Sequence, residues 1–184
     1  MKTLNDYIRE SLLDDEDILT GKVRRDVIAK SIYKKLINQE TLEQSELSWM
    51  NNNISVLVVN EQQLKNLLSK LHKKYYNISL NWLDVSKIID MSELFKYSKF
   101  NGDISKWDVS NVEYMKGMFK GATEFNQDIS GWDVSNVVDM SEMFMDAFKF
   151  NQDISNWKVS NVMSKMWVFL NSGCKLKNRP KFRA

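Results

Sequence analysis

Asparagine and aspartate recur at fixed intervals in the second half of the chain, and side chains of these types could hold a metal ion. The asparagines are Asn101, Asn126 and Asn151, and the aspartates two residues after each of them are Asp103, Asp128 and Asp153. Carboxylate and amide oxygens are the ligands that calcium prefers. The same side chains also satisfy unpaired backbone groups at turns, and the glycine-rich nonapeptide of calcium-binding β-rolls is absent. We therefore predict two structural ladders, with no metal ion and no other cofactor.

The other reactive side chains are too few for a recognisable enzyme site. The chain has one cysteine, Cys174, and one histidine, His72, which excludes an internal disulfide and a zinc site made of these residue types. His72 follows an apolar helix position and is expected to end a helix in solvent. Neither a serine–histidine–aspartate pattern nor a Walker-type phosphate loop can be found. We predict that the protein is not an enzyme.

A repeat of 25 residues positions the recurring side chains. Three near-identical copies begin at Phe100, Phe125 and Phe150. A less regular copy precedes them at about 78–98. In the copy at 125–147, Trp132 and Val134 alternate with polar residues, which indicates a short strand. The apolar residues that follow are spaced as on one face of a short helix: Val137, Met140, Met143, Phe144 and Ala147.

One such unit cannot bury its apolar side chains alone, so neighbouring copies must stack. In a parallel stack, like residues lie above like residues. We predict one buried column of Trp107, Trp132 and Trp157, and a second of Phe119, Phe144 and Phe169. Lys165 stands where the preceding copy has Met140, which indicates the end of the stack. The predicted fold class is α/β, a short solenoid of about four 25-residue repeats with a mainly helical N-terminal cap.

The part before the repeats is expected to be mostly helical. Apolar spacing predicts helices at 23–36 and 64–75, and β-branched residues predict a strand at 54–59. A short apolar stripe before an acidic run at 14–17 indicates a separate arm. The predicted organisation is an arm at 1–20, a cap with one strand at 21–76, the repeats at 77–170 and a basic tail at 171–184.

Solenoids bind partners through exposed positions that vary while the core positions stay constant. The variable positions here flank the predicted tryptophan column. They are Lys106, Gly131 and Asn156 before each tryptophan, and Asp108, Asp133 and Lys158 after it. We predict that these six residues contact a protein partner.

The repeat resembles a known family. The string Phe-Asn-Gln-Asp-Ile-Ser-Gly-Trp-Asp-Val-Ser-Asn-Val at 125–137, followed by Met-Ser-Glu-Met-Phe at 140–144, is similar to BspA-like leucine-rich-repeat surface proteins and to the related mycoplasma-lipoprotein repeat. The similarity extends over roughly residues 78–170. It implies a leucine-rich-repeat-like solenoid, and it implies protein binding or adhesion at the cell surface.

The first eleven residues carry a second, shorter resemblance. Met-Lys-Thr-Leu-Asn-Asp-Tyr-Ile-Arg-Glu-Ser looks like the capsid-targeting leader of internal proteins of T-even phages, in which cleavage follows a glutamate. The equivalent residue would be Glu10. The alternative function is therefore a phage-encoded protein, packaged in the virion or part of it, with an N-terminal targeting arm. An ordinary amphipathic helix explains the same residues.

Charge and hydropathy limit the partners and the location. The net charge of +2 gives no case for nucleic-acid binding by the whole chain. Five basic residues alternate in the tail: Lys175, Lys177, Arg179, Lys181 and Arg183. They could contact phosphate weakly or form a disordered, solubilising end. No run is apolar enough to span a membrane, and the N-terminus lacks a signal-peptide core. We expect a cytoplasmic or virion-associated protein, with the cell surface as the alternative that the family resemblance implies.

Overall fold

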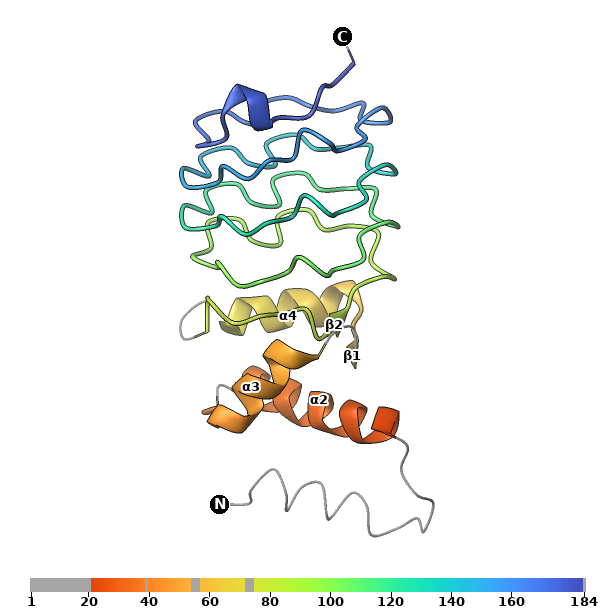
Figure 1. Cartoon of the computed structure of the whole chain (residues 1–184), viewed down its shortest axis with the longest axis vertical. Helices are drawn as coiled ribbons and strands as arrows, with labels where there is room; N and C mark the ends of the chain where they lie inside the picture. The colour runs from red at the N-terminus through yellow and green to blue at the C-terminus, as the bar shows by residue number, and fades with distance from the viewer. Residues whose placement is uncertain (1–20, 39, 54–56, 72–74, 184) are drawn as a thin grey trace.

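Three helices at one end of the protein lead into a stack of turns that continues to the other end (Figure 1). The computed structural model describes residues 21–38, 40–53, 57–71 and 75–183. Its elements are α2 (Gly21–Ile37), α3 (Gln44–Asn52), β1 (Leu57–Val58), α4 (Glu61–Leu71), β2 (Leu83–Asp84) and a 3-10 helix, η1 (Leu176–Asn178). β1 pairs with β2 in parallel, with Leu57 opposite Leu83. α4 lies directly beneath the first turn of the stack (Figure 1).

α3 and α4 begin where reciprocal hydrogen bonds satisfy their first backbone amides. At the start of α4, Gln63 N donates to Asn60 Oδ1 and Asn60 N donates to Gln63 Oε1, both at 2.9 Å. Such capping boxes satisfy amides that have no partner within the helix. α4 then buries Leu64 and Leu67 completely. The helices predicted at 23–36 and 64–75 correspond to α2 and α4, whereas the sequence did not predict α3.

The turns are joined by a ladder of backbone hydrogen bonds. The four segments 91–98, 115–122, 140–147 and 165–172, which we call the ribbons, lie one above another. Every second amide of a ribbon donates to a carbonyl of the next ribbon or of the residue just before it, as in Glu93 N to Lys116 O at 2.9 Å and Gly117 N to Ser141 O at 2.8 Å. Parallel bridges from Asp90 through Tyr114 and Asp139 to Ser164 mark the same register.

The conformation of each repeat differs from the expected strand followed by a short helix. Between β2 and η1 the described chain contains turns and isolated bridges, with no helix and no longer strand. In the ribbons, alternate amides donate to the carbonyl three residues earlier, as in Met143 N to Met140 O at 3.1 Å. The remaining alternate amides donate to the next ribbon. A continuous helix would need all of these amides within one segment, so the ladder between ribbons excludes it.

Each ribbon turns through two residues with left-handed backbone dihedrals. In the second ribbon both are glycines, Gly117 and Gly121, with φ of 58° and 66°. In the other ribbons the equivalent residues carry side chains: Glu93, Tyr97, Glu142, Asp146, Trp167 and Asn171. A left-handed conformation costs a residue with a Cβ roughly 1–2 kcal/mol. The ladder holds these residues in place.

We predict that Gly117→Ala lowers the unfolding free energy by about 1–2 kcal/mol. A Cβ at Gly117 would lie 3.7 Å from its nearest neighbours, so the loss reflects dihedral strain alone. Gly131→Ala is the matched control, because a Cβ there meets nothing within 4 Å and the residue has no left-handed φ. Urea unfolding of both variants tests this, and equal free energies would contradict the strain argument.

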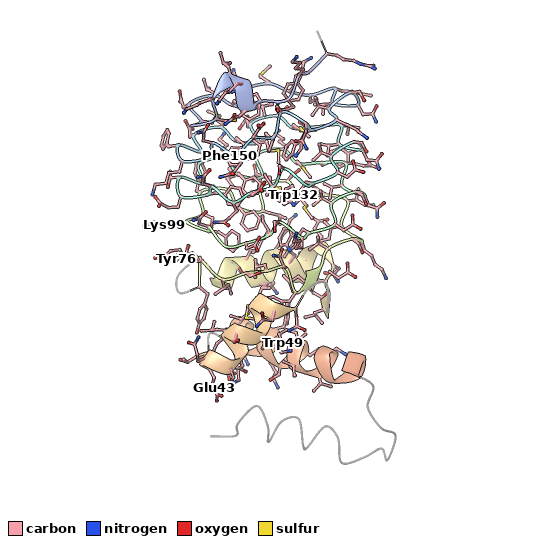
Figure 2. The ribbon with its side chains drawn as sticks, viewed as in Figure 1. Glu43, Trp49, Tyr76, Lys99, Trp132 and Phe150 are labelled. Atoms are coloured by element: carbon pink, nitrogen blue, oxygen red, sulfur yellow. The ribbon has the colours of Figure 1, made fainter. Side chains whose placement is uncertain are left out.

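Aromatic side chains form the predicted columns inside the stack. Trp132 stacks on Trp107 and on Trp157, with ring centroids 6.5 Å apart in both pairs. Phe144 lies 5.5 Å from Phe119 and 5.6 Å from Phe169. Figure 2 shows Trp132 and Phe150 within the stacked turns. Both predicted columns are therefore confirmed, and they share one apolar core with the helices.

The basic tail packs on the last turn and is not a disordered end. Asn178 and Pro180 are buried, and the Arg179 guanidinium lies 4.8 Å from the ring centroid of Phe169. Lys175 N donates to Asn151 Oδ1 at 3.0 Å, which continues the asparagine ladder into the tail. Trp167 does not close the stack as Phe169 does, because it is 55 % exposed.

Candidate binding surface

The six residues predicted to bind a partner all lie exposed on three successive turns. We call this surface the column face, and it consists of Lys106, Asp108, Gly131, Asp133, Asn156 and Lys158. They flank the buried tryptophans, of which Trp132 is 4 % exposed. Because each turn repeats the backbone of the one before, residues 25 apart lie in rows along the stack. The structure thus brings the six residues together on one surface.

Local hydrogen bonds fix the backbone beneath the column face. Asp108 Oδ1 accepts from Ser110 N, and Asp133 Oδ1 accepts from Ser135 N, both at 3.0 Å. Trp132 Nε1 donates to Ile104 O in the preceding turn at 3.2 Å. The aspartate bonds fix the backbone within a turn, and the tryptophan bond joins that turn to the one before it. The carboxylates of the face are therefore oriented before any partner arrives, which reduces the entropy lost on binding.

The charges of the column face are paired loosely. Hydrogen bonds from Ser135 hold the pKa of Asp133 below its usual range, and Lys158 lowers it further. The pKa of Asp128 is lowered by hydrogen bonds from Ser130, with a smaller contribution from Lys106. Both carboxylates are therefore ionised at neutral pH. Neither Lys106 nor Lys158 makes a side-chain hydrogen bond or ion pair among the described residues, so both ammonium groups are free to meet a partner.

The asparagine column forms the structural ladder that the sequence predicts, whereas Asp128 and Asp153 bond to amides within their own turns. Asn101 Oδ1 accepts from Asn126 N, and Asn126 Oδ1 accepts from Asn151 N, both at 2.9 Å. Asp128 Oδ1 accepts from Ser130 N at 2.9 Å. These oxygens are occupied by backbone amides. The described part of the chain contains no group of three or more histidine, cysteine or acidic side chains placed to hold a metal.

Calcium is expected to leave the thermal stability unchanged. A ligand stabilises a fold only when it binds the folded state, and the ladder oxygens already accept hydrogen bonds from backbone amides. Melting temperatures measured in EDTA and in millimolar calcium should agree. A rise of several degrees with calcium would show that the aspartates act as ligands.

A groove between α4 and the first turn is a feature that sequence reasoning missed. It has a volume of about 1040 Å³ and is lined by Lys65, Leu68 and Ser69 of α4, by Tyr76 and by residues 92–100. Figure 2 shows Tyr76 and Lys99 at the edge of the stack beside it. Lys96 Nζ lies 2.6 Å from Glu93 Oε1 in an exposed ion pair. No sequence pattern marks the groove, since it arises where a helix meets a turn of a different shape.

Cys174, the one cysteine of the chain, contributes nothing to a site. Burial raises the pKa of the Cys174 thiol, which is 2 % exposed, so it stays protonated and unreactive. Glu10, the predicted processing residue, and His72 lie outside the described residues. No helix within the described ranges has the length and apolar character needed to cross a membrane.

Comparison with known proteins gives one match. A family model described as "Mycoplasma protein of unknown function, DUF285" matches residues 62–180, from α4 through the stack into the tail. No curated protein and no solved structure matches the chain.

Proposed function

Because the chain belongs to the DUF285 family of mycoplasma proteins, whose function is unknown, we propose its function from its own surface. It is a non-enzymatic module that binds a protein partner through the column face. The finer family assignment, to BspA-like leucine-rich-repeat proteins, is part of the same proposal. So is the fold class, a short leucine-rich-repeat-like solenoid. The recurrence of bonds every 25 residues or so supports both.

One observation carries the functional proposal. The three turns share the hydrogen bond from each tryptophan indole to the turn before it, while the exposed side chains differ in charge and size: Lys106 becomes Gly131, and Asp133 becomes Lys158. Gly131 has no side chain, and Lys158 makes no side-chain hydrogen bond or ion pair among the described residues. A constant frame with changing exposed side chains is how repeat proteins build a specific surface.

A photo-crosslinking amino acid at position 131 tests whether this face meets a partner. The site is open, since a Cβ there has no neighbour within 4 Å. The matched control carries the same amino acid at position 116, where the exposed Lys116 lies in a ribbon. We expect one crosslinked protein from position 131 and not from 116. Equal crosslinking from both positions would contradict the proposal.

Charge reversal then tests the contact with the purified partner. Lys106→Glu together with Lys158→Glu should weaken binding at least about tenfold, because the change reverses both positive charges of the face and so disturbs its electrostatic complementarity to the partner. The melting temperature should stay the same, since both lysines are exposed. Unchanged affinity would remove the column face from the interface.

A further inference from the structure

The last ribbon, 165–172, ends the ladder with four backbone amides that have no partner within the part of the chain that the structure describes. In the preceding ribbon, the equivalent amides donate to carbonyls at 2.8–2.9 Å: Met140 to Ser164, Glu142 to Met166, Phe144 to Val168 and Asp146 to Leu170. One turn later come the amides of Lys165, Trp167, Phe169 and Asn171, which donate to no group among the described residues. Amides in such a row are a template for pairing with another extended chain.

The side chains beside these amides are apolar where the internal ribbons have mostly polar residues. Met163, Met166, Trp167 and Leu170 have relative exposures of 83 %, 61 %, 55 % and 41 %. Two turns earlier the same positions hold Glu113, Lys116, Gly117 and Lys120. A repeat that merely ends a stack in solvent needs a polar outer surface. The reverse is found here, which indicates that the surface is covered when the protein functions.

The charge around this edge is basic. Lys165 belongs to the ribbon itself, and its ammonium group donates to Arg183 O in the tail. The tail that passes beside the ribbon carries Lys175, Lys177, Arg179, Lys181 and Arg183, and it contains no acidic residue. A partner with acidic side chains is favoured by this charge.

A second copy of the chain is a poor occupant. Two last ribbons placed face to face would set amide donors against amide donors. A head-to-tail copy would need the carbonyl side of the first ribbon, 91–98. That side faces α4, and the space left is only the groove lined by Lys65, Leu68 and residues 92–100. The helices therefore block the surface that a second copy would have to offer.

We infer that the unpaired edge formed by the last ribbon and the two residues before it, residues 163–171, which we call the open edge, binds an extended acidic segment of a partner polypeptide. The partner's carbonyls accept from the amides of Lys165, Trp167, Phe169 and Asn171 and so add one more rung to the ladder. Alternate side chains of an extended chain point to opposite sides. The apolar side chains of the partner pack on Met166, Trp167 and Leu170, and its acidic side chains contact the basic tail. This binding mode adds a strand to an existing edge, and it does not depend on the column face.

The internal ribbons supply a variant that should fold and lack the site. Met163→Glu, Met166→Ser, Trp167→Gly and Leu170→Lys place at each position a residue that the same position holds in an earlier turn. Glycine also suits the left-handed φ of 57° at Trp167. One acid and one base are added, so the net charge is unchanged. Phe148→Ser, which removes another exposed aromatic side chain, 60 % exposed and outside the edge, is the matched control.

The probe is a labelled peptide of about ten residues, the length of the edge, in which glutamate alternates with valine. Hydrogen exchange on the full chain reports the amides directly. We expect the peptide to slow exchange at 165, 167, 169 and 171 at least tenfold. Anisotropy should show at least tenfold weaker binding of a peptide with lysine in place of glutamate. The quadruple variant should lose the binding, and Phe148→Ser should keep it.

Three results would overturn the inference. The first is no protection of the four amides at about millimolar peptide, the weak limit of useful affinity. The second is equal binding to the quadruple variant, which would mean that the basic tail alone attracts the peptide. The third is self-association of the free protein that the quadruple variant abolishes, which would assign the edge to a second copy. Loss of crosslinking at position 131 would bear only on the column face.

Discussion

Trp132→Ala is expected to lower the unfolding free energy by about 3–5 kcal/mol, the range for removing a buried large aromatic residue. The indole is 4 % exposed and lies between Trp107 and Trp157, with ring planes 5° from parallel in both pairs. Its removal leaves a cavity in the middle of a column. It also leaves Ile104 O without the donor that Nε1 supplies at 3.2 Å.

The loss is large against the 5–15 kcal/mol that stabilises a typical domain. Urea unfolding followed by circular dichroism measures it. Trp167→Ala is the control within the same chain, because that indole is 55 % exposed, and its removal should cost clearly less than removal of the buried one. If both variants lose the same free energy, the tryptophan column does not support the stack.

The sequence predicts the columns well because the repeats can be aligned with one another directly. In a stack of 25-residue turns, each residue packs against the equivalent residue of the next turn, whatever conformation the chain adopts between the two. Trp132 on Trp107 and Phe144 on Phe119 therefore follow from spacing alone. The asparagine bonds follow in the same way, since an amide beside a turn finds the equivalent turn next to it.

The conformation of the ribbons could not be predicted from the same spacing. The spacing of the apolar residues fits a helix, but it also fits consecutive tight turns, which here bury Met140, Met143, Phe144 and Ala147. Only Gly117 and Gly121 hint at left-handed dihedrals. In the other ribbons, residues such as Glu142 and Tyr97 adopt them because the ladder bonds outweigh the local preference.

α3 was missed for a different reason. Its nine residues contain few apolar side chains, and their pattern is too short to stand out. The usable signal was the pair Glu43 and Glu46, since Glu43 N donates to Glu46 Oε2 at 2.8 Å at the helix start. This signal is hard to recognise because glutamate is not a usual first residue of a capping box. The open edge had a visible signal too, namely apolar residues at 166, 167 and 170, where other copies are mostly polar.

Glu46→Gln is expected to cost about 3–5 kcal/mol, because it breaks a buried ion pair and leaves one charge without its partner. Glu46 Oε1 lies 2.9 Å from Lys35 Nζ, and the two side chains are 0 % and 12 % exposed. The pair joins α3 to α2. Glutamine keeps an oxygen for the amide of Glu43, so the loss reports the charge and not the capping bond.

A double-mutant cycle separates the effect of the ion pair on stability from the effect of burying the two side chains. Lys35→Met with Glu46→Gln removes both charges, and it should recover most of the loss, since an apolar replacement of a buried pair is often neutral. The exposed pair of Lys65 and Glu61, with atoms 2.5 Å apart and side chains 40 % and 43 % exposed, is the control. Glu61→Gln should cost no more than about 1 kcal/mol. A double variant as unstable as Glu46→Gln alone would show that the glutamate acts through packing, and that its charge is not what holds α3 on α2.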